Sequence, residues 1–212
     1  MIPLIQDFKT VVLADGNFPT HPTPLRCLLS AERIVCCDGA AEKLLHFGLE
    51  PNFIVGDLDS ISAETKKRYA KILHKISEQE TNDLTKAVNF CIENNWKEIT
   101  ILGLSGQRED HTLGNLSLLG DYAEKVGLQA FSDYGVFNVQ SVSETYESFI
   151  GQQVSLFSFI PTTLLSTQNL VYPLEKKALT SWWQGTLNES AADHFLVEME
   201  NLGKILVFRV FA

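Results

Sequence analysis

The sequence predicts an α/β protein in two parts: an N-terminal, mainly parallel sheet with helices on both faces, then a small antiparallel β-sandwich. Short apolar runs alternate with helical patterns up to about residue 137. Strand-like segments without long helices between them fill the remainder. Strands separated by helices indicate a parallel sheet with covered faces, and successive short strands indicate an antiparallel fold. The expected domains are therefore residues 1–137 and 138–212.

The first part contains alternating strand and helix signals. Runs rich in apolar and β-branched residues predict strands at 10–14, 33–37, 53–55, 71–76, 98–102 and 128–132. Helical spacing or composition predicts helices at 24–30, 40–47, 62–70, 82–94 and about 111–126. Gly48 is placed to end the second helix, and Ser62 is placed to cap the third.

The second part contains strand-like segments separated by turn residues. The segments are 136–139, 153–160, 169–174, 195–199 and 204–211, with turn residues at Pro161, Pro173, Gly185 and Gly203. This pattern favours an antiparallel sandwich. For the adjacent Trp182 and Trp183, packing in the core and lining a pocket both remain open.

Charge and cysteine content limit the possible partners and compartments. The 17 Lys and Arg against 26 Asp and Glu give a net charge of −9, which argues against non-specific binding to nucleic acid or anionic membranes. No apolar run approaches the roughly 18 residues of a membrane span, and the first residues lack the pattern of a secretory signal. The four cysteines form no C-x-x-C pair, which favours reduced core thiols in a cytoplasmic protein.

Two acids follow the third predicted strand, in the stretch Val55-Gly56-Asp57-Leu58-Asp59-Ser60. In extended chain, residues two apart point the same way, so Asp57 and Asp59 would face one spot beyond the strand end. Two like charges repel unless a cation lies between them, and hard divalent cations prefer oxygen ligands. The pattern predicts a Mg²⁺ site, while a polar turn before the next helix remains the alternative.

Other acids are expected at the same sheet edge. Asp15 and Asp38 follow the first two predicted strands, whose ends the sheet brings side by side. Asp83 begins the long amphipathic helix, and Lys86 lies one helical turn later, facing the same site. The alternative for Asp83 is that it caps the helix together with Asn82.

A polar loop, Gln107-Arg108-Glu109-Asp110-His111, lies between a predicted strand and a predicted helix. Arg108 can grip a phosphate with two hydrogen bonds, and Asn115 follows His111 by four residues on the same helix face. Capping of the helix by Asp110 is the alternative. The chain has no G-x-x-x-x-G-K-[ST] and no G-x-G-x-x-G after the first strand, so an acidic sheet edge with a few cations suits Mg²⁺-nucleotide chemistry without a P-loop.

These motifs resemble the thiamine pyrophosphokinase family. The matching stretches are Asp38-Gly39-Ala40-Ala41, Gly56-Asp57-Leu58-Asp59-Ser60, Asn82-Asp83-Leu84-Thr85-Lys86-Ala87 and 106–115, with a weaker match over 165–174 and 187–189. The order, spacing and α/β-then-β layout all agree, so the resemblance covers nearly the whole chain.

The resemblance implies a Mg²⁺-dependent transferase that moves pyrophosphate from ATP to the hydroxyl of thiamine, giving thiamine diphosphate and AMP. It implies Mg²⁺ ligands at Asp57, Asp59 and Asp83, and ATP-side contacts at Asp38, Gln79, Lys86, Arg108, His111 and Asn115. Asp110 would orient or deprotonate the attacking hydroxyl. Ser166, Thr167, Tyr172 and Asn188 would face thiamine, with Tyr172 stacking on its rings or, alternatively, packing in the core. The family is a homodimer with its thiamine pocket shared between subunits.

The chain departs from the family pattern at three positions. It has Asn82 where the family usually has Thr, Asn169 where it has Gly, and Leu187 where it has Ser. The last two fall in the expected thiamine pocket, so a different small alcohol as acceptor is a second hypothesis. A non-catalytic thiamine or nucleotide sensor is a third, against which the retained acids and Arg108 argue.

Overall fold

The computed structural model describes residues 9–212, so the first residues, expected to carry no secretory signal, lie outside the described part. The chain divides into two compact units on either side of Asp133 and Tyr134. We call the unit up to Asp133 the α/β unit and the unit from Tyr134 to Ala212 the β unit. Within residues 9–212, no helix has the length and apolar character that crossing a membrane requires.

The α/β unit is built on six parallel strands in the order β6-β5-β1-β2-β3-β4. Their bounds are β1 Thr10–Leu13, β2 Arg33–Cys37, β3 Phe53–Gly56, β4 Leu73–Lys75, β5 Glu98–Leu102 and β6 Gly127–Phe131. The side chains of β1 are buried throughout because helices cover both faces of the sheet. The predicted parallel sheet is confirmed.

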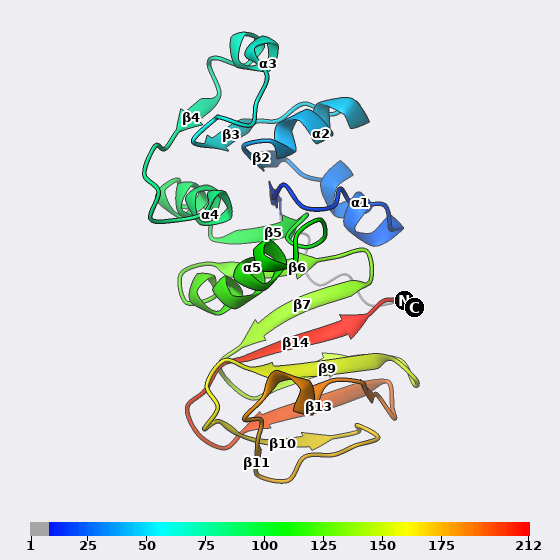
Figure 1. Cartoon of the computed structure of the whole chain (residues 1–212). Helices are drawn as coiled ribbons and strands as arrows, with labels where there is room; N and C mark the ends of the chain where they lie inside the picture. Colours follow the sequence, from blue (N-terminus) through cyan, green and yellow to red (C-terminus); the bar gives the residue numbers. More distant parts are fainter. Residues whose placement is uncertain (1–8) are drawn as a thin grey trace. The chain divides into compact units, whose positions relative to one another are not determined.

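Five helices connect these strands: α1 Pro22–Leu29, α2 Ala40–Phe47, α3 Ala63–Arg68, α4 Asp83–Glu93 and α5 Glu109–Tyr122. Figure 1 shows α1 and α2 on one face of the sheet and α4 and α5 on the other. The strand order reverses between β1 and β5, and in open parallel sheets the crevice beyond such a switch point is where ligands bind.

Local signals account for several helix ends. Gly48 adopts φ 93°, the left-handed conformation that ends α2 as predicted. The Ser62 hydroxyl accepts a hydrogen bond from the Thr65 amide and caps α3, also as predicted. The apolar stripe of α4, comprising Leu84, Ala87, Val88 and Cys91, is buried.

The β unit contains two antiparallel sheets. One has the order β12-β9-β14-β7 and the other β11-β10-β13-β8. Their bounds are β7 Gly135–Gln140, β8 Glu144–Glu147, β9 Gln153–Ser158, β10 Leu164–Gln168, β11 Lys177–Ala178, β12 Asn188–Glu189, β13 His194–Met199 and β14 Ile205–Val210, with a 3₁₀ helix η1 at Trp182–Gly185. The predicted antiparallel β fold is confirmed.

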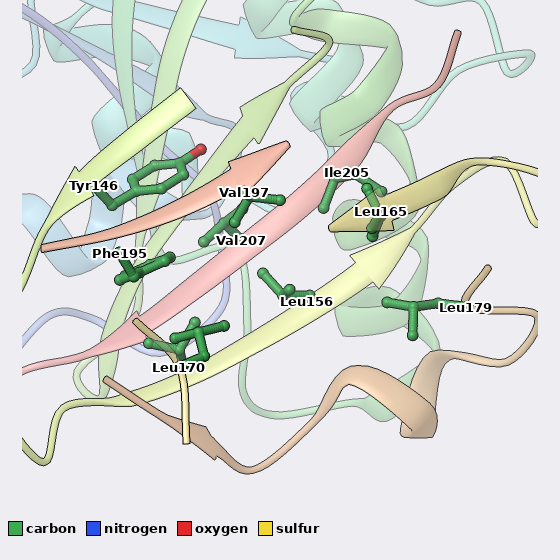
Figure 2. Packing of buried hydrophobic residues seen from close by; sticks show 10 residues of the cluster. Tyr146, Leu156, Leu165, Leu170, Leu179, Phe195, Val197, Ile205 and Val207 are labelled. Carbon is green, nitrogen blue, oxygen red and sulfur yellow. The ribbon is translucent and has the colours of Figure 1, made fainter. Parts of the chain in front are cut away.

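One hydrophobic core joins the inner faces of these two sheets (Figure 2). Leu156 and Val207 of the first sheet and Leu165 and Phe195 of the second have at most 1% of their surface exposed. The rings of Phe195 and Tyr146 stack with centroids 5.2 Å apart. Residues two apart on β9, β13 and β14 reach this core (Val154 and Leu156, Phe195 and Val197, Ile205 and Val207), which is the pattern of a sandwich.

The prediction of a strand over residues 169–174 is wrong. The strand is β10, which ends at Gln168, and Asn169 follows with φ 62°, a left-handed conformation that breaks the extended chain. Leu170 is nevertheless buried, paired with Ser190 by an isolated bridge. The apolar side chain that suggested a strand therefore belongs to a turn that inserts into the core.

The two adjacent tryptophans have different environments. Trp182 donates its indole N–H to the Ser158 carbonyl at 3.2 Å and packs edge-on against Phe157 at 5.6 Å. The side chain of Trp183 is 74% exposed. Of these two tryptophans, Trp182 is the one that packs η1 against β9.

Candidate active site

A pocket of about 330 Å³ lies in the α/β unit, among the segments that follow β1, β3, β4 and β5 and the first turns of α4 and α5. Its lining includes five of the six residues predicted to contact ATP, namely Gln79, Lys86, Arg108, His111 and Asn115, and two of the three predicted Mg²⁺ ligands, Asp57 and Asp83. It therefore forms at the carboxyl edge of the sheet, beside the switch point between β1 and β5.

Three carboxylates gather at this edge. Asp38, Asp57 and Asp59 each offer an oxygen atom, and these atoms all lie within 4.8 Å of one another. Asp38 follows β2 and is only 3% exposed; its Oδ2 accepts the Ser60 amide at 3.1 Å. Its Oδ1 is buried and has no hydrogen-bond partner among residues 9–212. Burial raises the pKa of the Asp38 carboxyl, and the neighbouring Asp83 and Asp57 raise it further.

The chain reaches this arrangement through a turn rather than through extended alternation. Leu58 has φ 67°, so the expected extended path from Asp57 to Asp59 is wrong. Asp57 Oδ1 accepts the Asp59 amide at 3.1 Å, and this hydrogen bond is the main cause of a lowered pKa at Asp57. Gln79 adds a longer contact of 3.4 Å from its Nε2 to Asp57 Oδ2. The polar turn and the carboxylate cluster are thus one structure.

Gly56 lets the acids approach from two strands and a helix. A Cβ at this position would lie 2.9 Å from Asp38 Cβ and 3.3 Å from Asp83 Oδ1. Asp83 is outside the group of three but beside it, and its Oδ1 accepts from Lys86 Nζ at 3.1 Å. The Lys86 side chain is 3% exposed, so a cation with little access to water lies against the acidic edge.

The capping alternative for this segment is confirmed for Asn82 alone: Asn82 is the N-cap of α4, with its Oδ1 accepting the Thr85 amide at 2.9 Å, whereas Asp83 is the first residue of the helix. The corresponding alternative for α5 is wrong. The N-cap is Arg108, and Asp110 lies inside the first turn. Asp110 instead holds Arg108, whose hydrogen bond lowers the pKa of the Asp110 carboxyl.

Sequence reasoning placed Asp15 at this edge but gave it no role, and it missed Lys43. Lys43 Nζ lies 2.7 Å from Asp15 Oδ1 and also donates to the carbonyls of Asp15 and Gly16. Gln107, at φ 64°, donates to the same Gly16 carbonyl at 3.2 Å. These contacts shape the pocket wall after β1. The signal for Asp15 was its place after a strand, whereas nothing in the sequence pairs Lys43 with it.

The four residues predicted to face thiamine lie in the β unit. Asn188 is buried, and its amide accepts from the Tyr172 backbone N–H at 3.0 Å and donates to the Tyr172 carbonyl at 2.7 Å. Thr167 accepts the Leu174 amide at 2.9 Å. Ser166 donates to Glu200 at 2.7 Å. Asn188 and Thr167 therefore hold the 169–174 turn, while the ring of Tyr172 is 67% exposed, which excludes the core alternative for that residue.

Two departures from the family pattern have left-handed backbone. Asn169 has φ 62° and Leu187 has φ 58°. Asn adopts this conformation more readily than other non-glycine residues, which explains why it can stand where glycine is usual. Leu187 gains no such compensation, and its side chain is 77% exposed.

Comparison with known proteins covers both units. Residues 25–130 match the family described as thiamin pyrophosphokinase, catalytic domain, and residues 135–208 match thiamin pyrophosphokinase, substrate-binding domain. Thiamin pyrophosphokinase 1 of Caenorhabditis elegans is 28% identical over 193 residues, covering 79% of each chain. Thiamine pyrophosphokinase of Bacillus subtilis is 36% identical over 86 residues, covering 39% of this chain and 40% of the relative.

Solved structures share the fold. Thiamin pyrophosphokinase from Candida albicans superposes with a TM-score of 0.80 at 18% identity, covering 100% of this chain and 96% of that one. The enzyme from Bacillus subtilis gives 0.79 at 21% identity, with coverage of 95% and 99%. The structural likeness by itself supports only the fold. The matches to both domain families show that the chain belongs to the thiamin pyrophosphokinase family.

Proposed function

We propose that this protein is a Mg²⁺-dependent thiamine pyrophosphokinase that transfers the β,γ-pyrophosphoryl group of ATP to the hydroxyl of thiamine, releasing AMP. The observation that carries the site assignment is the single pocket edge where three carboxylates, a buried lysine and an arginine meet. Transfer of a phosphoryl group depends mainly on positioning and charge neutralisation, and these residue types supply both.

The carboxylate cluster suits a hard cation. Its donors are all oxygens, and the buried Oδ1 of Asp38 accepts no hydrogen bond from any of residues 9–212, so it can still serve as a ligand. We assign Mg²⁺ to Asp57 and Asp59, with Asp38 and Asp83 beside them. When bound, Mg²⁺ would offset the repulsion between the carboxylates and the ATP phosphates. It would also stabilise the negative charge on the pyrophosphoryl group that is transferred.

The remaining residues act on ATP and on the acceptor. Lys86, whose Nζ is paired with Asp83, can neutralise the charge of an ATP phosphate bound in the pocket. Gln79, His111 and Asn115 border the same space, and Arg108 can bind a second phosphate through its planar guanidinium. We assign to Asp110, which is paired with Arg108, the role of accepting the proton of the attacking hydroxyl as the new P–O bond forms. Thus the α/β unit would act on ATP.

We assign thiamine recognition to the β unit. The exposed ring of Tyr172 can stack on a cationic heteroaromatic ring, and Ser166, Thr167 and Asn188 lie on the segments that carry or hold it. We also propose a homodimer with the thiamine site at the subunit interface. The exposed Tyr172, Trp183 and Leu187 support it, because apolar surface of this kind favours an interface. A cytoplasmic location agrees with the buried thiols of Cys36, Cys37 and Cys91.

The test is AMP release from ATP, measured with and without thiamine and with and without Mg²⁺. The proposal expects AMP and thiamine diphosphate in equal amounts only when all three components are present. AMP release with another small alcohol but not with thiamine would favour the second hypothesis, which the left-handed Leu187 and Asn169 motivate. Binding of ATP and thiamine without any turnover would favour a sensor. Sedimentation of the active protein as a monomer would contradict the shared site.

A further inference from the structure

We propose that the side chains of Asn82 and Asn115 form a positioning link that fixes the α4 half of the ATP site against the α5 half. The α4 half is Asp83 and Lys86, and the α5 half is Arg108 and His111. This inference rests on the proposed function, because it concerns the geometry in which that reaction occurs.

The link is a continuous chain of hydrogen bonds. Asn82 Nδ2 donates to Asn115 Oδ1 at 3.1 Å, and Asn115 Nδ2 donates to the Leu104 carbonyl at 2.8 Å. Both polar ends of the Asn115 amide are therefore used within the protein, although the family resemblance implied a contact with ATP. Leu104 is 1% exposed, so the end of this hydrogen-bond series at Asn115 is anchored in the core after β5.

At its other end, this series of hydrogen bonds is anchored on α4 by Thr85, which also contacts α5. Asn82 Oδ1 accepts from the Thr85 amide at 2.9 Å and from the Thr85 hydroxyl at 2.8 Å. The Thr85 hydroxyl also lies 2.6 Å from the hydroxyl of Tyr122, which is buried near the end of α5. The first turn of α4 is thus tied to α5 at two points, Asn115 and Tyr122, which limits both sliding and rotation.

The orientation of each amide follows from its partners. The Thr85 N–H can only donate, so the oxygen of Asn82 must face it and the NH₂ must face Asn115. The Leu104 carbonyl can only accept, so the NH₂ of Asn115 must face it and the oxygen must face Asn82. The same two orientations satisfy every contact.

Capping alone does not require asparagine at position 82. Ser caps helices about as well as Asn, Thr is only somewhat weaker, and the family usually has Thr at this place. A hydroxyl, however, has a single oxygen that would have to cap α4 and also reach Asn115 on α5. The Asn82 amide has an oxygen that caps α4 and a separate NH₂ group that donates to Asn115 on α5. The contact with α5 is what asparagine adds at this position.

The link acts on the groups that would hold ATP. Asp83 is adjacent to Asn82, and the Lys86 amide donates to the Asn82 carbonyl at 3.1 Å. Asn115 lies one helical turn after His111 on α5. A small relative shift of α4 and α5 would change the distance between Lys86 and Arg108, and displacements near 1 Å can lower rates by about 100-fold. We therefore expect the link to influence turnover without touching the reacting atoms.

The experiment compares Asn82→Ser and Asn82→Thr with Asn94→Ser. Asn94 is the C-cap of the same helix, where its Nδ2 donates to the Phe90 carbonyl at 2.8 Å, and it lies outside the pocket. Both Asn82 variants keep a capping oxygen and should lower kcat/KM for ATP about tenfold. Their melting temperatures should fall no more than that of Asn94→Ser, which should keep wild-type kinetics.

A double-mutant cycle with Asn115→Ser tests the pairing. The double variant Asn82→Ser/Asn115→Ser should be no slower than Asn115→Ser, because one link is lost in either case. Wild-type kinetics in both Asn82 variants, or losses that multiply in the double variant, would overturn the proposal. A kinetic loss matched by a fall in the folded fraction would do the same.

The outcome is separable from that of the proposed function. If the wild-type protein releases no AMP with thiamine and Mg²⁺, the proposed function fails. The link is then measured by calorimetric binding of ATP with Mg²⁺, in which Asn82→Ser should bind more weakly than Asn94→Ser. Equal affinities of the two variants would overturn the link.

Discussion

Arg108 and Asp110 form a two-point ion pair, with Arg108 Nε 3.1 Å from Asp110 Oδ1 and Nη2 2.5 Å from Oδ2. Both side chains are exposed at the start of α5, Arg108 at its N-cap and Asp110 in its first turn. The pair occupies the Nε–Nη2 edge of the guanidinium, one of the edges with which Arg108 could bind a phosphate through two hydrogen bonds. Under the proposed function, ATP that binds through this edge would compete with the pair and leave the Asp110 carboxylate free to accept a proton.

Asp110→Asn should separate these two roles. Loss of the carboxylate frees Arg108, so ATP should bind about two- to fivefold more tightly, within the range of exposed ion pairs. Turnover should fall about 100-fold because the proton acceptor is lost. Glu109→Gln removes the same charge from the neighbouring exposed residue and is the control for long-range electrostatics. Weaker ATP binding by Asp110→Asn than by Glu109→Gln would contradict the competition.

Asp38→Asn should raise stability in a pH-dependent way. Burial raises the pKa of Asp38 above 3.8, so the folded protein binds the proton more tightly than the unfolded chain. This contribution is complete below the unfolded pKa and is lost as pH rises through the folded pKa. The variant should therefore gain melting temperature relative to wild type as pH increases from about 4 to 7. A constant difference across this range, measured by thermal unfolding, would contradict the assignment.

Asp57→Asn and Asp59→Asn should abolish most turnover. Each removes a carboxylate from the cluster, so we expect rates at least about 100-fold lower and a higher Mg²⁺ requirement for what remains. Chelation with EDTA should stop the wild-type reaction, and added Mg²⁺ should restore it. Asp121→Asn, an exposed carboxylate near the end of α5, is the matched control. Full turnover in both variants would refute the metal site.

The tryptophan pair offers a natural comparison of packing. Trp182→Ala removes the edge-on contact with Phe157 and leaves the Ser158 carbonyl without its indole donor, so it should cost about 2–4 kcal/mol of unfolding free energy. Trp183→Ala removes a side chain that is 74% exposed and should change it by less than about 0.5 kcal/mol. Urea titration of the two variants provides the measurement. Equal losses would show that Trp183 also packs.

Asn188→Ala should raise KM for thiamine with little change in kcat. The side chain holds both backbone groups of Tyr172, so its loss frees the turn that presents the ring. Asn201→Ala is the control, since Asn201 makes the same kind of two-point contact with Leu164 and Thr162. Steady-state kinetics with varied thiamine distinguish the two. An equal rise of KM in both variants would attribute the effect to general loosening of the β unit.

The sequence predicted the elements whose local signals agree with their packing. Helix 40–47 and strands 33–37 and 98–102 have the predicted bounds, because apolar runs, a terminal glycine and buried faces all indicate the same limits. Strand β10 was missed since its Ser166, Thr167 and Gln168 lack an apolar alternation, and its pairing with β13 decides its conformation.

The proximity of the residues proposed for the ATP side was predictable, because parallel strands end at one edge of the sheet. The way the acids meet was not, since it depends on the left-handed Leu58 and on the space beside Gly56. Contacts such as Lys43 with Asp15 join residues that are distant in the sequence and carry no local pattern. Their geometry is set by tertiary packing alone.

The unpartnered Oδ1 of Asp38 has a consequence for the life of the protein in a cell. Binding of a cation and a nucleotide at the acidic edge would make the occupied protein more stable than the empty one, since a ligand that binds only the folded state adds to its stability. Chains that unfold are removed by proteases, so differences of about 1–2 kcal/mol change abundance several-fold. We expect the amount of this protein to rise and fall with the supply of its own nucleotide and cation, which makes the acidic edge a sensor of supply as well as a place of reaction.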